Sequence, residues 1–294
     1  MKLVTYKEKG MEKIGVASAD GRKIYPMQDM GIRETTMLDF IENFDEAKLK
    51  ELEEKVNSGK VKAVEAAQVE KAAPIPRPKQ DVVCLGINYM EHAKESAKYE
   101  KEEFNGERPY AVYFSKRVSE ASADGDQIPS YEGFVDSLDY ESELAVIIGK
   151  DAKNVKKEDA FDYVFGYTIM NDVSARTIQM RHKQWYFGKS LDGFTPMGPW
   201  IVTKDEFEEP PVLKICSRVN GELRQNSCTD LLIFDIPFVI EELSAGMTLK
   251  AGTIISMGTP AGVGMGFDPP KFLKPGDVVE CEIEGIGILK NTVK

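Results

Sequence analysis

After residue 80 the chain is a succession of short β-forming segments with very little helix between them. Each segment is rich in Val, Ile, Phe or Tyr and is bounded by turns that contain Gly or Pro, a pattern typical of strands. The predicted strands are Asp81–Leu85, Ala111–Phe114, Leu144–Ile148, Tyr163–Met170, Trp200–Thr203, Leu213–Val219, Thr253–Met257 and Val278–Ile283. Only Val155–Tyr163 and Asp235–Ser244 indicate helices there. The pattern predicts an α+β fold that is predominantly β, a sandwich, roll or barrel and not a parallel α/β sheet.

The first 75 residues have a different character. Strands are predicted at Lys2–Tyr6, Lys13–Ala19 and Lys23–Pro26. Apolar residues recur at helical spacing over residues 37–69 among many charged ones. Prolines at positions 74, 76 and 78 then oppose regular structure and suit a linker. We therefore expect a small N-terminal α+β domain over residues 1–75 and a main domain over residues 76–294.

Charge and cysteine content narrow the class of protein. The chain carries 38 Lys and Arg against 49 Asp and Glu, a net charge of −11, which argues against a nucleic-acid partner. No apolar run approaches the roughly 18 residues of a membrane span, and the N-terminus does not resemble a signal peptide. The four cysteines are far apart and fit neither zinc spacing nor a disulfide framework. We expect free thiols and a cytoplasmic protein without a membrane partner.

Three carboxylates stand at positions where strands meet the predicted core. Glu141 and Glu143 are two residues apart at the start of a strand, so their side chains project from one face. Asp172 follows the next apolar strand. An exposed strand face and a turn cap are the commoner uses of such residues. If the two strands pair, however, the three oxygen ligands suit Mg²⁺ or Mn²⁺.

Of the two histidines, His92 has the context of a general base. Glu95 lies one helical turn away and could fix the tautomer of the imidazole and raise its basicity. His182 lies in a polar stretch and is expected to be exposed. The segment Glu91–Glu107 is dense in charge, which is typical of a solvated helix or of a mobile lid.

Two lysines and one loop are candidate contacts for an anionic ligand. Lys116 follows a predicted strand, and Lys189 lies in a Gly-Lys-Ser sequence. The loop Met257–Gly264 consists of small residues, so its amides and the Thr259 hydroxyl could hold an oxyanion or a carboxylate. An ordinary turn cluster is the alternative.

Taken together, these segments resemble the fumarylacetoacetate hydrolase family over about residues 80–294. The matching stretches are Gly86–Tyr89 with His92 and Glu95, Asp139–Ala145, Gly166–Tyr167, Asn171–Arg176, Gly188–Ser190, Pro196–Trp200, Val219–Glu222, Gly258–Gly264 and Pro275–Asp277. The resemblance implies a mixed β-sandwich roll, usually dimeric, with a metal held by the residues that match Glu141, Glu143 and Asp172. It also implies a dyad of His92 and Glu95 on a lid.

The resemblance extends to the substrate contacts. It implies Lys189 as a catalytic residue and Thr259 as a substrate contact, and we also expect Lys116, Arg176 and Gln225 to bind the substrate. Specificity is expected around Ile87, Tyr113, Arg176, Gln225 and the lid. Two departures from the family pattern concern the substrate: Ile87 stands where Arg is frequent, and Thr177 stands where Asp is common.

The function that this resemblance implies is metal-dependent hydrolysis of a C–C bond in a 1,3-diketo or acylpyruvate-type 2-oxo acid. His92 would activate water, and the metal would stabilise the departing enolate. Two alternatives remain open. The same site could decarboxylate an oxo acid or isomerise its keto and enol forms, or the chain could be a metal-binding module without catalysis. The expected partners are a small oxo acid and a second copy of the chain in a homodimer.

Overall fold

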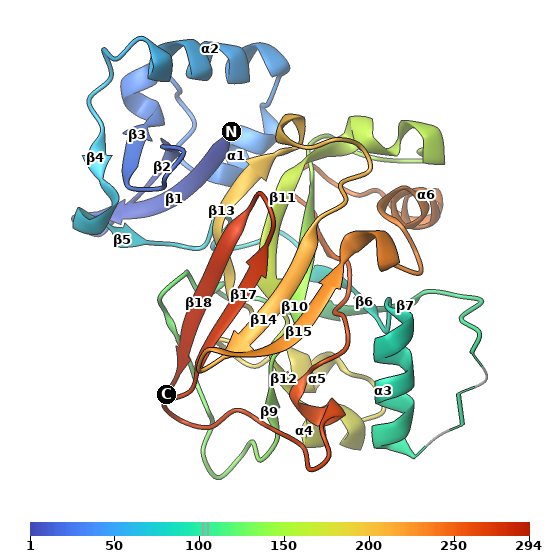
Figure 1. Ribbon diagram of the computed structural model, residues 1–294. Coiled ribbons are helices and arrows are strands. Elements are labelled where there is room, and N and C mark those ends of the chain that lie inside the picture. The colour runs from blue at the N-terminus through green and yellow to red at the C-terminus, as the bar shows by residue number, and fades with distance from the viewer. Residues whose placement is uncertain (102, 105) are drawn as a thin grey trace.

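The structure is a computed structural model that describes residues 1–101, 103–104 and 106–294 (Figure 1). One large mixed sheet organises it, in the strand order β4-β3-β2-β1-β13-β11-β10-β16-β6-β7, with β5 paired to β1. The strands are β1 Lys2–Glu8, β2 Met11–Ala17, β3 Lys23–Pro26, β4 Val64–Glu65, β5 Glu70–Lys71, β6 Val82–Gly86, β7 Val112–Lys116, β10 Ser142–Ile148, β11 Val164–Asn171, β13 Met197–Thr203 and β16 Ile254–Ser256.

A second sheet packs against the middle of the first. Its order is β15-β14-β17-β18-β8, and its strands are β8 Gln127–Ile128, β14 Lys214–Val219, β15 Glu222–Cys228, β17 Val278–Ile283 and β18 Gly287–Val293. A short pair, β9 Leu138–Asp139 with β12 Ser174–Ala175, lies below them in Figure 1. The predicted α+β class, dominated by sheet, is confirmed in this mixed, layered arrangement.

Strand β10 shows why the sequence of a central strand is a continuous apolar run. Leu144, Val146 and Ile148 belong to the core shared with the second sheet, whereas Ala145 and Ile147 belong to the core on the opposite face. Both faces of the strand are therefore covered, and no position needs to be polar for solvent. Because both faces of this strand are buried, the ionisable side chain of Glu143 is unusual there.

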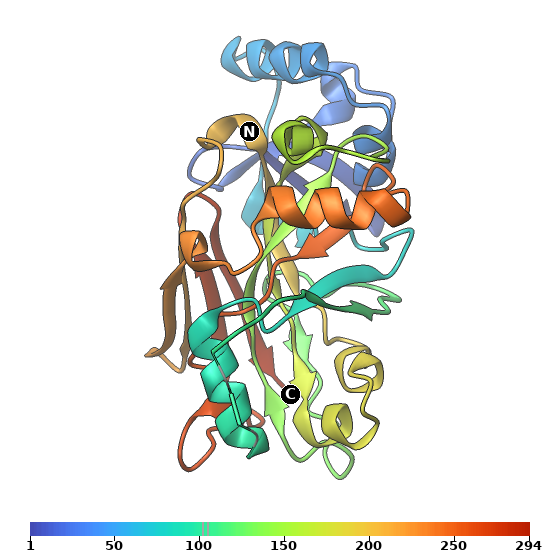
Figure 2. The ribbon, with the colours of Figure 1, turned by 90° about the vertical axis from the view of Figure 1, so that its right-hand side faces the viewer.

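Helices cover the faces and the lower end of the sheets. The α-helices are α1 Met37–Glu42, α2 Glu46–Asn57, α3 Met90–Glu100, α4 Arg176–Arg181, α5 Tyr186–Lys189 and α6 Ile236–Gly246. The 3₁₀ segments are η1 Met27–Met30, η2 Ala66–Gln68, η3 Lys157–Tyr163, η4 Lys204–Glu206, η5 Thr229–Leu231 and η6 Gly264–Gly266. Figure 2 shows α3 on one side of the lower end and α4 with α5 on the other. None of the described helices is long and apolar enough to cross a membrane.

The predicted strands are present, with boundaries shifted by up to three residues. The predicted helix at Val155–Tyr163 is instead the 3₁₀ segment η3, and the helical pattern over residues 37–69 gives α1 and α2 only, with β4, η2 and β5 following. Strands from before and after residue 75 belong to the same sheet, because β1 pairs with β13 through Leu3 and Ile201. The division into two domains at that residue stays a prediction.

Candidate active site

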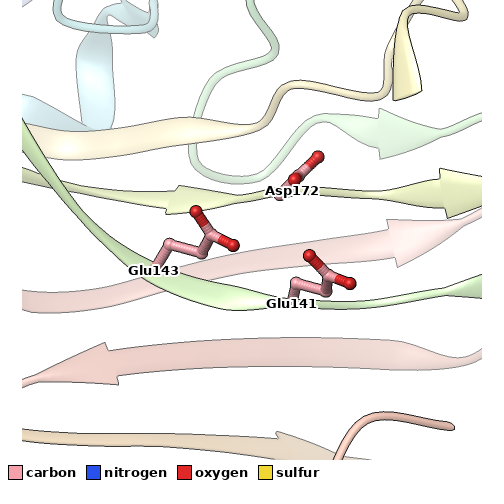
Figure 3. Close-up of side chains that lie close together, drawn as sticks. All are labelled: Glu141, Glu143 and Asp172. Atoms are coloured by element: carbon pink, nitrogen blue, oxygen red, sulfur yellow. The ribbon is translucent and has the colours of Figure 1, made fainter. Parts of the chain in front are cut away.

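Three buried carboxylates meet where β10 and β11 pair. Ser142 lies opposite Asn171 in the antiparallel register, so Glu141 and Glu143 flank the start of β10 next to the residue that follows β11, Asp172. The backbone amide of Asp172 donates to the carbonyl of Glu141 over 2.9 Å. One carboxylate oxygen of each acid lies within 4.8 Å of the others, and Figure 3 shows the three groups gathered along the paired strands.

Three buried cations contact this acidic cluster of Glu141, Glu143 and Asp172. The Nζ atom of Lys189 lies 2.8 Å from both Glu141 Oε2 and Asp172 Oδ2. Lys116 Nζ lies 2.5 Å from Asp172 Oδ1. Arg176 Nη1 lies 2.6 Å from Glu141 Oε1. Two of the three acids therefore have positively charged partners.

Glu143 has a different environment. Its Oε2 accepts hydrogen bonds from the Ser256 hydroxyl over 2.5 Å and from the Gly258 amide over 3.2 Å. Within the described residues it makes no ion pair. Burial raises its pKa well above the usual value, and the charges of Asp172 and Glu141 raise it further.

The pKa of Glu141 moves in the opposite direction. Burial alone would raise this pKa, but the charges of Lys189 and Arg176 outweigh burial, and the pKa falls well below its usual range. The acidic cluster therefore contains one acid fixed as a carboxylate and one that lacks a cation partner. Three close carboxylate groups, one of them on an acid that makes no ion pair among the described residues, fit a hard divalent cation.

A His–Glu pair lies on α3, and its histidine lines the same pocket as Glu141 and Glu143. His92 is buried, and its Nδ1 lies 3.0 Å from Glu95 Oε2. The Glu95 carboxylate also accepts from the Gly262 amide over 3.0 Å. Gly266 gives it room, because a Cβ at that position would lie 1.7 Å from Glu95 Oε1. The loop around η6 thus holds Glu95, and Nε2 is the nitrogen of His92 that remains for chemistry.

One pocket is lined by His92, Glu141, Glu143, Arg176 and Lys189, whereas Asp172 and Glu95 contact Lys189 and His92 from outside the described lining. Its polar lining consists of His92, Ser96, Glu100, Glu141, Glu143, Arg176, Gln179, Lys189 and Thr259. Its apolar lining consists of Leu85, Gly86, Ile87, Phe114, Met180, Trp185 and Met265. The pocket therefore places a base, carboxylates and fixed cations around one small ligand space.

Arg176 carries an unused donor at this pocket. Its Nε donates to Asp139 over 2.9 Å, and its Nη1 contacts Glu141 and Gln179. Its Nη2 is buried and has no hydrogen-bond partner among the described residues. A guanidinium held on two sides with a free N–H group is suited to bind a substrate carboxylate.

Lys116 and Gln225, predicted as substrate contacts, are placed behind the pocket and are not among its described lining residues. Lys116 is fully buried between Asp172 and the Val173 carbonyl. The Gln225 amide donates to Thr259 Oγ1 over 2.6 Å and to Pro260, and it accepts from Ser142 and Ser217. Both side chains therefore position other site residues in this structure.

Two structural residues were missed by sequence reasoning. Asp139 accepts from the Gly264 and Met265 amides over 2.6 and 3.0 Å, so it connects Arg176 to η6. Asn88 donates to the carbonyls of Met257 and Phe234 and so joins the residues after β6 to those after β16. Their only signal was membership of the family motifs. His182 is exposed as expected, and positions 102 and 105 of the predicted lid lie outside the described residues.

Comparisons with known proteins agree with this geometry. The family model described as "Fumarylacetoacetate (FAA) hydrolase C-terminal" matches residues 81–294. Oxaloacetate tautomerase YisK of Bacillus subtilis is 49% identical over 227 residues, which cover 77% of this chain and 74% of that protein. The solved fumarylacetoacetate hydrolase of Exiguobacterium antarcticum is 39% identical, with a TM-score of 0.85 over 100% of this chain and 99% of its own.

A relative solved with a metal ion and a small ligand is also similar to this chain. Maleylpyruvate hydrolase from Sphingobium sp. SYK-6, in complex with manganese(II) and pyruvate, is 30% identical to this chain. The likeness covers 100% of this chain and 98% of that one, with a TM-score of 0.79.

Proposed function

Because this chain belongs to the fumarylacetoacetate hydrolase family, we propose that it is a divalent-metal-dependent enzyme that interconverts the keto and enol forms of a short 2-oxo acid of the oxaloacetate type. The observation that carries the proposal is that His92 lines one pocket with Glu141 and Glu143, two members of the buried acidic cluster. The 49% identity to an oxaloacetate tautomerase supports tautomerisation over the C–C hydrolysis that the sequence favoured.

Glu141, Glu143 and Asp172 would hold Mg²⁺ or Mn²⁺. Their oxygens are close together and buried, and Glu143 lacks a cation partner within the described residues, so this donor set fits the ion. The manganese in the maleylpyruvate hydrolase structure supports the same assignment. When bound, the cation supplies stabilisation of the negative charge that develops on the enolate.

Side chains of the pocket transfer the proton between carbon and oxygen of the substrate and hold the substrate in place. His92, oriented by Glu95, takes a proton from the carbon next to the substrate carbonyl and returns it to the carbonyl oxygen. The proton lost by carbon is gained by oxygen, so no oxidant or water is consumed. Glu95 stabilises the imidazolium that forms between the two steps, and Lys189 places a fixed positive charge beside the pocket. Arg176 binds the substrate carboxylate through Nη2.

The test follows the enol absorbance of oxaloacetate with Mg²⁺ or Mn²⁺, before and after removal of the metal by a chelator. We expect the protein to accelerate interconversion, the chelator to abolish the acceleration, and His92→Gln to reduce it at least a hundredfold. The matched control is His182→Gln, because His182 is exposed. Acceleration that survives chelation, or that persists in His92→Gln, would contradict the proposal.

C–C hydrolysis is the second candidate. The same dyad can activate water, and 30% identity to a maleylpyruvate hydrolase supports this chemistry. A panel of acylpyruvates and oxaloacetate, scored by product, separates the candidates. Carboxylate and pyruvate release would show hydrolysis, CO₂ release would show decarboxylation, and a tautomer shift alone agrees with our proposal. The absence of any turnover would favour a metal-binding module.

A further inference from the structure

The apolar side of the pocket is built around one indole ring. Trp185 precedes α5 and is half-buried in the pocket lining. Its ring meets Phe114 of β7 edge to face, with 5.3 Å between the ring centroids. The ring also lies directly on Gly86, the last residue of β6. Trp185 therefore occupies the space between two neighbouring strands at the edge of the ligand pocket.

The contact with Gly86 is too close for any side chain there. A Cβ at position 86 would lie 2.1 Å from Cζ3 of Trp185 and 2.7 Å from Cη2. The φ angle of Gly86 is not in the left-handed region, so space and not backbone conformation requires glycine at this position. Glycine at position 86 therefore leaves the space on β6 that the indole of Trp185 occupies.

The position of the indole is also fixed relative to the catalytic groups. The Lys189 amide donates to the Trp185 carbonyl over 3.2 Å, so the two residues are one helical turn apart. The Lys189 ammonium in turn lies 5.2 Å from the centroid of the Phe114 ring. Trp185, Phe114 and Lys189 therefore form one packed unit that joins the apolar side of the pocket to its polar side.

From this arrangement we infer that Trp185 limits the size of the substituent on the substrate carbon next to the carbonyl. The inference rests on the proposed function, which places the oxo-acid group against the acidic cluster and Arg176. The substituent must then point toward the apolar side, where the indole fills the space in front of Gly86. The pocket accepts short substituents and excludes longer acyl chains.

The first experiment measures binding, which does not depend on turnover. Calorimetry with the Mn²⁺-loaded protein compares oxamate with N-hexyloxamate, an unreactive analogue that carries a long substituent. We expect Trp185→Ala to improve the affinity for N-hexyloxamate relative to oxamate at least tenfold, since single methylenes already change pocket affinities by that order. The control is Phe187→Ala, because Phe187 is 44% exposed on the adjoining helix α5 and does not line the pocket.

An unchanged affinity ratio in Trp185→Ala, or an equal gain in Phe187→Ala, would overturn the inference. If the wild type binds both analogues in the expected order but does not turn over oxaloacetate, the proposed function fails and the size limit stands. Activity adds a second measure: the ratio of kcat/KM for long acylpyruvates over oxaloacetate should rise in Trp185→Ala and stay constant in Phe187→Ala.

A double-mutant cycle tests the cause. Gly86→Ala should displace the indole and change the affinity ratio in the wild-type background, whereas in the Trp185→Ala background the added methyl has open space and should have little effect. Equal effects of Gly86→Ala in both backgrounds would show that the Gly86–Trp185 contact does not set the limit. Circular dichroism melts check that all four proteins fold.

Discussion

Glu143 illustrates how the site depends on individual residues. It lies on a strand that, apart from Ser142, is otherwise apolar on both faces, and its pKa is raised by burial and by its acidic neighbours. A buried charge without a partner is strongly destabilising, so such a residue is expected to have a compensating ligand. Under the proposed function, a divalent cation shared with Glu141 and Asp172 would supply that compensation.

Glu95 gives a prediction about the dyad. Glu95→Gln keeps an acceptor for the Gly262 amide but removes the negative charge that stabilises a protonated His92. We expect kcat to fall by about 10²–10⁴, the range of general acid–base contributions, while Mn²⁺ affinity changes less than threefold. Steady-state kinetics and calorimetry on the same preparation measure both. A parallel loss of metal affinity would mean that Glu95 acts through the acidic cluster.

Tyr6 gives a prediction about stability. Its side chain is buried, its hydroxyl has no partner among the described residues, and burial raises its pKa from 10.0 to about 12. Because the folded state holds the neutral phenol more tightly than the unfolded state, its contribution is complete below pH 10 and is lost as the pH rises toward 12. Tyr6→Phe should therefore match or exceed wild-type stability at pH 7 and lose less stability between pH 10 and 12.

Urea unfolding at several pH values measures this difference. A destabilisation of more than about 1 kcal/mol at pH 7 would show that the Tyr6 hydroxyl has a partner that contributes to stability.

At the scale of elements, the residues of the acidic cluster were easier to predict from the sequence than the residues that hold them in place. Glu141, Glu143 and Asp172 could be predicted because polar residues at the ends of apolar strands are conspicuous. The role of Lys116 depends on the β6–β7 pairing, which local periodicity does not encode. The β14–β15 hairpin that carries Gln225 is indicated by its Asn220-Gly221 turn, but the contacts of Gln225 with Ser142 and Thr259 are tertiary. The family resemblance supplied the dyad, and residue spacing alone would have left it one alternative among several.

The elements that were missed have a common cause. Strand β15 is Glu222–Cys228 and strand β18 is Gly287–Val293; both carry several exposed positions and therefore lack an apolar run. The helices α4 and α5 are six and four residues long, too short for helical periodicity to be visible. Tertiary pairing, and not intrinsic propensity, determines these segments.

The pairing of β11 with β13 yields a prediction at this scale. A Cβ on Gly166 would lie 2.3 Å from the Val202 carbonyl oxygen in the neighbouring strand. Gly166→Ala should therefore reduce the free energy of unfolding by about 1–3 kcal/mol, as overpacking of a core does. Gly246 at the end of α6 is the matched control, because a Cβ there meets nothing within 4 Å. Chemical denaturation of both variants distinguishes them, and equal stabilities would contradict the close approach of the two strands.

At the scale of the whole molecule, the N-terminal strands and the catalytic strands share one sheet through the β1–β13 pairing. The helices α3, α4 and α5, which carry His92, Arg176 and Lys189, lie at the opposite end of the molecule from α2 (Figure 1). Substitutions in the N-terminal segment should therefore affect stability more than the chemistry of the pocket.

The expected homodimer stays a prediction. Sedimentation or light scattering should give twice the chain mass of 32.8 kDa at micromolar concentration. A mass of 32.8 kDa under the same conditions would contradict the dimer, while the pocket, whose described lining residues all come from this one chain, would remain intact.

Titration with Mn²⁺, followed by the electron paramagnetic resonance of the free ion, tests the central claim most directly. The account predicts one tightly bound ion per chain in the wild type and at least tenfold weaker binding in Glu143→Gln and in Asp172→Asn. It predicts unchanged binding in Glu222→Gln, which alters an exposed acid. Folded Glu143→Gln protein that binds Mn²⁺ as tightly as the wild type would contradict the account, because the cation would then lie elsewhere.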